Sequence, residues 1–154
     1  DHTIWFDRIF SGAEQEVIIS GTWRTLGFGL PAAISAKLAR PERQVVAVVG
    51  DGGFAQVLAE FLTAVRYQVP ITVIVVNNGY LAMEKDRMEK QEMPVEVTGL
   101  TNPDFAKFAE ICGGKGFKVG HPDELENVLK SAFQSQTPNI VEVITGSPKF
   151  PGVK

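Results

Sequence analysis

The stretch VVAVVGDGGFAQVLAEF, residues 45–61, decides the fold and raises a question of charge. An apolar, β-branched run enters a glycine turn, and apolar residues then recur at helical spacing. A turn between a strand and a helix N-terminus presents backbone N–H groups and favours anions. Asp51 nevertheless brings a carboxylate into the same turn. A bound cation would allow Asp51 and an anionic ligand to lie side by side.

Composition is that of an ordinary globular domain. The 154 residues are 44% hydrophobic and 21% charged, and the formal net charge of −3 argues against a nucleic-acid binder. No apolar run is long enough to span a bilayer, so membrane contact is not indicated. The single cysteine allows no internal disulfide, and we expect a cytoplasmic location. We interpret residues 1–154 as one domain excised from a longer protein.

Short apolar runs alternate with amphipathic stretches along the chain. Continuous β-branched runs are typical of strands buried on both faces, as in a parallel sheet covered by helices. The predicted class is therefore α/β, doubly wound, with a mainly parallel sheet and helices on both faces. A solvated helix or a mobile loop is expected at residues 84–92. Strands are predicted at 16–20, 44–49, 71–76, 117–119 and 140–144, and helices at 27–39, 54–65, 103–112 and 125–133, the third capped by Asn102 with Pro103 at its first position.

Three interpretations of the glycine turn are open. Gly50, Gly52 and Ala55 fit the dinucleotide-binding pattern, but that fold wants an acid at the end of the next strand, where Asn77 and Asn78 stand. In the second interpretation, Asp51 and the Asn78 side chain meet at the carboxyl edge of the sheet and share a Mg²⁺ ion with phosphate oxygens. The backbone carbonyl of Tyr80 could complete the protein's share. In the third, Asp51 is only a helix cap.

Paired motifs carry a resemblance to one family. Gly50-Asp51-Gly52, then 24 residues, then Asn77-Asn78 resembles the thiamine-diphosphate signature. SGTWRTLGFGLPAAISAKL, residues 20–38, is similar to the preceding segment in the acetolactate synthase and pyruvate oxidase group. PERQVVAVVGDGGF and ITGSPKFP resemble pyruvate oxidase. The resemblance implies the C-terminal, cofactor-binding domain of a three-domain enzyme that decarboxylates a 2-oxo acid, with pyruvate as substrate and FAD in the full-length enzyme.

The resemblance also implies ligands for the metal and the diphosphate. Asp51, the Asn78 side chain and the Tyr80 carbonyl would bind Mg²⁺. The backbone N–H groups of Gly52 and Gly53 would bind the diphosphate. An acetolactate synthase-like carboligase is the alternative enzyme, and a non-catalytic nucleotide-binding module is the alternative from a different class.

Further roles follow from the same resemblance. His2 would reach the phosphates, and the Arg24 carbonyl would accept a hydrogen bond from the aminopyrimidine. Leu26 would be the apolar wedge that bends the cofactor, which makes Arg24 and Leu26 the catalytic assignments. Met83 would pack near the thiazolium, with Ala82 beside it. The activating glutamate would come from the N-terminal domain of another subunit, so a homo-oligomer, dimer or tetramer, is expected and the isolated chain should be inactive.

Overall fold

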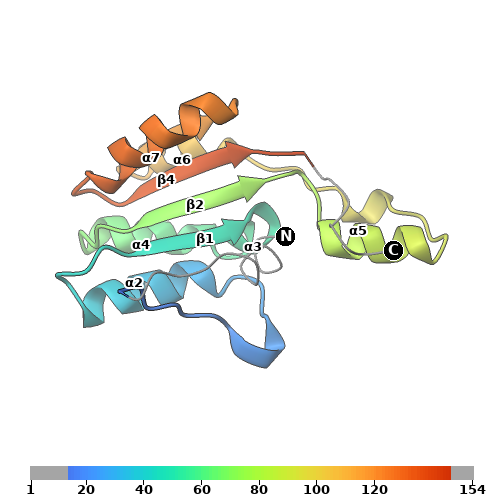
Figure 1. The fold of residues 1–154 in the computed structure, drawn as a ribbon, viewed down its shortest axis with the longest axis horizontal. Helices are drawn as coiled ribbons and strands as arrows, with labels where there is room; N and C mark the ends of the chain where they lie inside the picture. Colours follow the sequence, from blue (N-terminus) through green and yellow to red (C-terminus); the bar gives the residue numbers. More distant parts are fainter. Residues whose placement is uncertain (1–13, 147–154) are drawn as a thin grey trace.

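One parallel sheet organises the molecule. The computed structural model describes residues 14–146, in which four strands lie in the order β1-β2-β4-β3 and run in one direction (Figure 1). Gly50 pairs with Val76, so β1 and β2 end at the same edge. That edge brings Asp51 and the residues after Asn77 together. The strands are β1 Val46–Gly50, β2 Thr72–Asn77, β3 Lys115–Val119 and β4 Asn139–Ile144.

Helices lie on both faces of this sheet, and Val46 and Val48 of β1 remain 38% and 51% exposed. On one face Ala47, Val73 and Ile140 are buried with side chains of α2, α4 and α6. On the other face, Val141 packs with α7. Figure 1 shows α5 beyond the carboxyl ends of the strands, outside these layers. The helices are α2 Gly29–Ala39, α3 Asp51–Ala55, α4 Phe61–Arg66, α5 Ala82–Lys90, α6 Phe105–Ile111 and α7 Leu125–Phe133, and the short 3-10 turns are η1 Gly21–Trp23, η2 Leu58–Glu60, η3 Glu96–Thr98 and η4 Pro122–Glu124.

Alternating covered faces and parallel pairing confirm the predicted doubly wound α/β class. None of the helices within residues 14–146 is long and apolar enough to cross a bilayer. The predicted solvated helix or loop at 84–92 is helical as far as Lys90, within α5.

Helix α6 lies directly on the sheet, and this contact positions part of the site. A Cβ added to Gly116 would lie 2.0 Å from the carbonyl oxygen of Ala106, so only glycine fits beneath the helix. The rings of Phe54 and Phe105 meet edge to face at 5.3 Å and join α3 to α6. The start of α6 is thereby held against β3 and beside α3.

The predicted strand at 16–20 is wrong. This segment forms no strand, and Val17, Ile18 and Ile19 are 47–60% exposed. A strand is stabilised by pairing and burial, and the apolar pattern alone does not supply a neighbour. The described sheet consequently has four strands where five were expected.

Two predicted helices have different bounds. The helix expected at 54–65 begins at Asp51 and is divided into α3, η2 and α4, because Val57, with φ −131° and ψ 15°, leaves the helical region. Asn102 is not the cap of α6. Asp104 is, since its side chain accepts a 2.9 Å hydrogen bond from the N–H of Lys107. Asn102 uses its side chain elsewhere.

Candidate functional site

Asp51 is a buried carboxylate at the carboxyl end of β1, with only 3% of its surface exposed. Its Oδ2 accepts two hydrogen bonds, one of 2.9 Å from the N–H of Gly79 and one of 2.7 Å from Nδ2 of Asn102. Gly50, not Asp51, occupies the N-cap position of α3, and no side chain caps that helix. The interpretation of Asp51 as a helix cap is therefore wrong, because its carboxylate reaches across to the loop after β2.

Asn78 and Tyr80 form a tight turn beside Asp51. Oδ1 of Asn78 accepts a 2.9 Å hydrogen bond from the N–H of Tyr80. Tyr80 forms an antiparallel bridge with Gly99, flanked by backbone hydrogen bonds of 2.9 and 2.8 Å. In such a pair the residue's own N–H and C=O point away from its partner. The Tyr80 carbonyl thus lies on the side where its N–H meets Asn78.

The glycine turn is closely surrounded. A Cβ on Gly52 would lie 2.7 Å from Cδ2 of Leu81, and a Cβ on Gly53 would lie 3.6 Å from Cδ2 of Leu26. Leu26 therefore lies against the turn although the two are far apart in sequence. Its side chain remains 46% exposed, so the rest of the described chain does not cover it. A half-exposed leucine beside the turn is available to a ligand.

The remaining predicted residues differ in their surroundings. Arg24 is exposed and left-handed, with φ 45° and ψ 43°, a conformation that favours glycine. Met83 is 41% exposed, whereas Ala82 is buried at the first position of α5. His2 lies outside the described residues.

Sequence reasoning missed a chain of polar side chains behind Asp51. Nδ2 of Asn102 also donates to Oδ1 of Asn77 at 3.1 Å, and Nδ2 of Asn77 donates to Oε1 of Glu142 at 2.8 Å. Glu142 is only 1% exposed and lies in β4. A glutamate inside the apolar run NIVEVI was the available signal, because charged residues are rarely buried without a partner. Asn102 offered none beyond its capping pattern.

Lys118 closes the far end of this chain. Its Nζ lies 3.4 Å from Oε2 of Glu142 and 3.0 Å from Oδ2 of Asp104. The hydrogen bond that Lys118 donates to Asp104 raises the pKa of Lys118. The N–H of Lys107 and then the Lys118 ammonium hold the pKa of Asp104 below its usual value. Hydrogen bonds thus connect the cap of α6 to the carboxylate at the end of β1.

The donor set fits a magnesium ion that carries phosphate ligands. Mg²⁺ prefers an octahedron of oxygens, of which the protein usually supplies one or two and phosphates or water the rest. Asp51, Asn78 and the Tyr80 carbonyl offer oxygens only, with a single charge. Within residues 14–146 no group of three or more His, Cys, Asp or Glu side chains could hold a metal.

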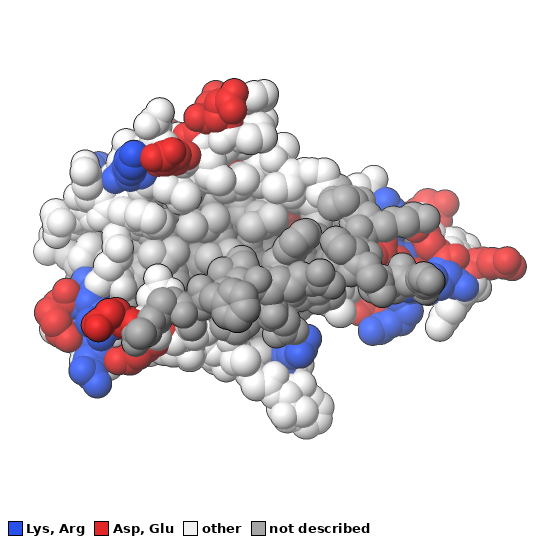
Figure 2. All heavy atoms as spheres, viewed as in Figure 1, with Lys and Arg blue, Asp and Glu red and all other residues white. Residues whose placement is uncertain are grey.

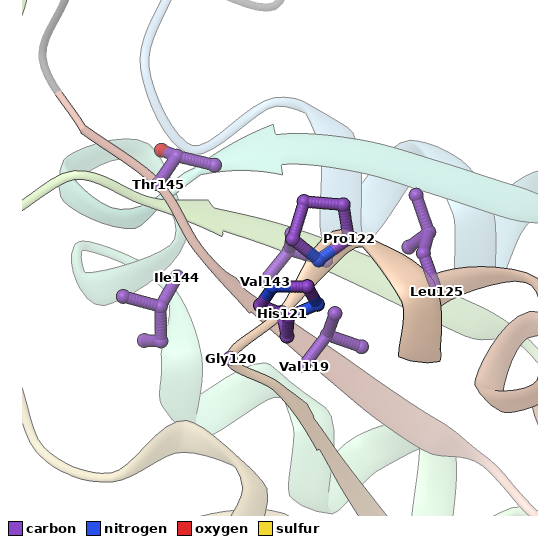
Figure 3. A pocket seen from close by; sticks show the side chains of 8 residues that line it. All are labelled: Val119, Gly120, His121, Pro122, Leu125, Val143, Ile144 and Thr145. Atoms are coloured by element: carbon purple, nitrogen blue, oxygen red, sulfur yellow. The ribbon is translucent and has the colours of Figure 1, made fainter.

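An apolar depression beyond the ends of β3 and β4 is a different feature (Figure 3). Its volume is about 160 Å³, well below the roughly 300–1,000 Å³ of ligand pockets. None of the predicted ligands lines it. Its lining residues are Val119, Gly120, His121, Pro122, Leu125, Val143, Ile144 and Thr145.

Charges of both signs are interspersed over α5, as Figure 2 shows. Arg87 and Glu84 lie 3.0 Å apart, and Lys85 and Glu89 lie 3.9 Å apart. This mixed helix surface does not resemble the single-sign patch that binds a nucleic-acid backbone.

Comparison with known proteins identifies relatives over nearly the whole chain. Residues 1–143 match the family model described as thiamine pyrophosphate enzyme, C-terminal TPP binding domain. A Bacillus subtilis protein, YdaP, provisionally named as thiamine pyrophosphate-containing, is 44% identical over 97% of this chain and 26% of its own length. Acetolactate synthase of the same organism is 38% identical over 92% of this chain and 25% of its own. The chain therefore spans about a quarter of these curated relatives.

A solved structure shares the fold. The thiamine diphosphate-dependent 4-hydroxybenzoylformate decarboxylase of Rhodococcus jostii RHA1 superposes with a TM-score of 0.75 at 31% identity. The match covers 81% of this chain and 24% of that one.

Proposed function

We infer that this chain, which belongs to the thiamine pyrophosphate enzymes as their C-terminal TPP-binding domain, binds the magnesium diphosphate end of the cofactor through its glycine turn. One observation carries the assignment of the residues. The 2.9 Å hydrogen bond from Gly79 to Asp51 draws the loop of Asn78 and Tyr80 to the end of β1. Oxygen ligands from two neighbouring strands thereby gather at one point of the sheet edge.

The proposed metal ligands are Asp51, the Asn78 side chain and the Tyr80 carbonyl. Asp51 contributes the one negative charge, while neutral oxygens from the other two avoid repelling a diphosphate. Gly52 and Gly53 lie in the first turn of α3, whose N–H groups have no acceptor within the helix. These N–H groups are the proposed donors to the diphosphate.

Leu26 and Arg24 are proposed to hold the cofactor's shape. Leu26 lies against the glycine turn with half its surface uncovered, as a side chain that supports a bent ligand must. Arg24 takes part through its backbone carbonyl, and its side chain is exposed. Thiamine diphosphate, when bound, supplies the electron sink for decarboxylation of a 2-oxo acid. The residues of this chain bind the cofactor and orient it.

We propose a pyruvate oxidase-like enzyme with FAD, on the sequence motifs that flank the glycine turn. The acetolactate synthase relative supports a second candidate, a carboligase. The names of the relatives include synthases, a lyase and a decarboxylase, so the pyruvate oxidase candidate rests on the sequence motifs alone.

Calorimetry on the intact protein tests the binding function. Thiamine diphosphate should bind only with Mg²⁺ present, and NAD and ATP should not bind. Binding of a nucleotide in place of thiamine diphosphate would support the non-catalytic alternative. Bound flavin that pyruvate reduces, with electrons passed to a quinone, would identify the oxidase. Acetolactate formed without flavin reduction would identify the carboligase.

A partner domain is part of the proposal. Trp23 in η1 is 90% exposed and Val97 in η3 is 78% exposed, and both lie in loops that frame the carboxyl end of the sheet. Their apolar surface is open to contact with a partner domain. The proposed partner is the N-terminal domain of another subunit in a homo-oligomer. The isolated chain should then fail to accelerate hydrogen–deuterium exchange at C2 of added thiamine diphosphate, whereas the intact protein should accelerate it.

A further inference from the structure

We propose that Asn102 is a positioning residue that orients the carboxylate of Asp51 toward Mg²⁺. Asn102 is itself oriented by Asn77, and Asn77 by Glu142. The inference rests on the proposed function, because it concerns the same metal. Asn102 does not touch the ion. Its role is to hold a ligand in the orientation that the ion requires.

The contacts of Asp51 define that orientation. Nδ2 of Asn102 and the N–H of Gly79 both donate to Oδ2, at 2.7 and 2.9 Å. Among residues 14–146, Oδ1 receives no hydrogen bond, so it is the oxygen available to a cation. The side chain is also 97% buried, which restricts its rotation. Without Asn102, one of the two donors that distinguish Oδ2 from Oδ1 is lost.

Glu142 gives this hydrogen-bond chain its direction. A carboxylate only accepts, so Asn77 must present its Nδ2 to Glu142 at 2.8 Å and turn its Oδ1 toward Asn102. Asn102 must then present Nδ2, and its two hydrogens meet Asn77 and Asp51. A reversed Asn102 amide would place its oxygen against two acceptors.

Glu142 is itself held from two sides. Nζ of Lys118 lies 3.4 Å from its Oε2, and the N–H of Ala106 lies 3.5 Å from the same oxygen. The direction of the chain is therefore set by β3, β4 and α6, and it ends at Asp51.

The orientation of the Asp51 carboxylate should affect the affinity for Mg²⁺ more than the affinity for Ca²⁺. Magnesium requires near-ideal octahedral geometry at about 2.0–2.1 Å, whereas calcium accepts about six to eight ligands at about 2.3–2.6 Å in flexible arrangements. A carboxylate that is free to rotate is therefore a poorer ligand mainly for magnesium. Removing a residue that orients a metal ligand typically lowers metal affinity by about 10–100-fold. The effect should be selective between the two ions.

The test titrates the intact protein, saturated with thiamine diphosphate, with MgCl₂ and separately with CaCl₂. In Asn102→Ala the Kd for Mg²⁺ should rise by about 10–100-fold, and the Kd for Ca²⁺ by a smaller factor. Asn127→Ala is the matched control, because it makes the same chemical change at an exposed residue of α7. It should leave the ratio of the two Kd values unchanged.

A second variant acts without touching Asp51. Glu142→Gln can donate to Asn77 and so allows the amide chain to reverse. Glu142→Gln should raise the Kd for Mg²⁺ by a smaller factor than Asn102→Ala does. If Asn102→Ala does not fold, Glu142→Gln serves as the test.

Three results overturn the inference. These are an unchanged Mg²⁺ Kd in both variants, equal losses for the two ions, or the same shift of the ratio in Asn127→Ala. If the wild-type protein shows no Mg²⁺-dependent binding, the proposed function fails instead, so the two failures are distinguishable.

Discussion

Replacement of Asp51 by asparagine removes one charge and almost no volume. In the wild type, Oδ2 accepts hydrogen bonds from Gly79 and Asn102. Both partners are donors, so the new amide must turn its oxygen toward them. Its Nδ2 then lies where Oδ1 was, and two N–H hydrogens point at the proposed cation. Asp51→Asn should therefore fold and lose the metal.

Two magnitudes can be bounded, the loss of metal affinity from below and the loss of folding stability from above. Two unit charges about 4 Å apart interact by about 4 kcal/mol at an effective dielectric constant of about 20. A metal–ligand contact is shorter and the ion is divalent, so the loss should exceed about 4 kcal/mol, or about 10³-fold in affinity. Hydrogen bonds to charged groups contribute about 1.5–3 kcal/mol and neutral ones about 0.5–1.5. The metal-free variant should thus lose less than about 3 kcal/mol of stability for its two bonds.

Calorimetry of thiamine diphosphate binding to the intact protein, with Mg²⁺ varied, measures the first quantity. Thermal unfolding without metal measures the second. Asp123→Asn is the matched control, because it makes the same chemical change at a side chain that is 90% exposed, and it should leave both unchanged. A Mg²⁺-dependent affinity of Asp51→Asn within tenfold of the wild type would refute Asp51 as the charged ligand.

Three further variants test other parts of the structure. Leu26→Ala should lower kcat by up to about 10²-fold while the Kd for the cofactor changes less, because the diphosphate and metal contacts survive. An unchanged kcat with a much higher Kd would contradict the role of Leu26 as a wedge that bends the cofactor. Gly116→Ala should lower the free energy of unfolding by more than the roughly 1–3 kcal/mol of ordinary overpacking, because its Cβ would lie 2.0 Å from the Ala106 carbonyl oxygen. Gly120→Ala, whose Cβ would have nothing within 4 Å, should be near neutral in the same thermal unfolding experiment. Asp104→Ala should weaken amide protection of residues 105–111 by about 0.5–2 kcal/mol at pH 6. In the folded protein the pKa of Asp104 lies below its ordinary 3.8, so the stabilisation by this cap is present above pH 3.8 and is lost as the pH falls through the folded pKa. The difference between wild type and Asp104→Ala should therefore shrink at low pH. A difference that stays constant with pH would contradict the carboxylate as cap.

The strands of the sheet could be predicted because their signal is local. All four observed strands begin and end within two residues of the predicted bounds. β1, β2 and β4 are rich in β-branched residues over a run too short for a helix, and burial on both faces explains the continuous apolar pattern of β2 and β4. Residues 16–20 carry a similar pattern without forming a strand. What separates the cases is a neighbour to pair with, which lies elsewhere in the sequence.

The site was predictable only in part, for the same reason. Asp51, Asn78 and Tyr80 follow the ends of neighbouring strands, so the topology of a parallel sheet is enough to bring them together. Asn102 is different. Its local pattern, with Pro103 next to it, favours a helix cap, but its amide is used by Asp51, 51 positions earlier in the chain. Both hydrogens of its Nδ2 are used at long range, and the N-cap of α6 is Asp104, two residues further along the chain.

Asp51 and Glu142 show two ways of burying a carboxylate. Both are almost fully buried, and isolation of such a charge from water is costly unless hydrogen bonds or an opposite charge compensate. Glu142 has the ammonium of Lys118 at 3.4 Å. Asp51 has neutral donors only, since no salt bridge to it is present within residues 14–146. A lysine beside Asp51 would neutralise it and compete with a metal ion. The neutral donors fix its orientation and leave its charge unmatched, which is the condition under which a divalent cation gains most by binding there.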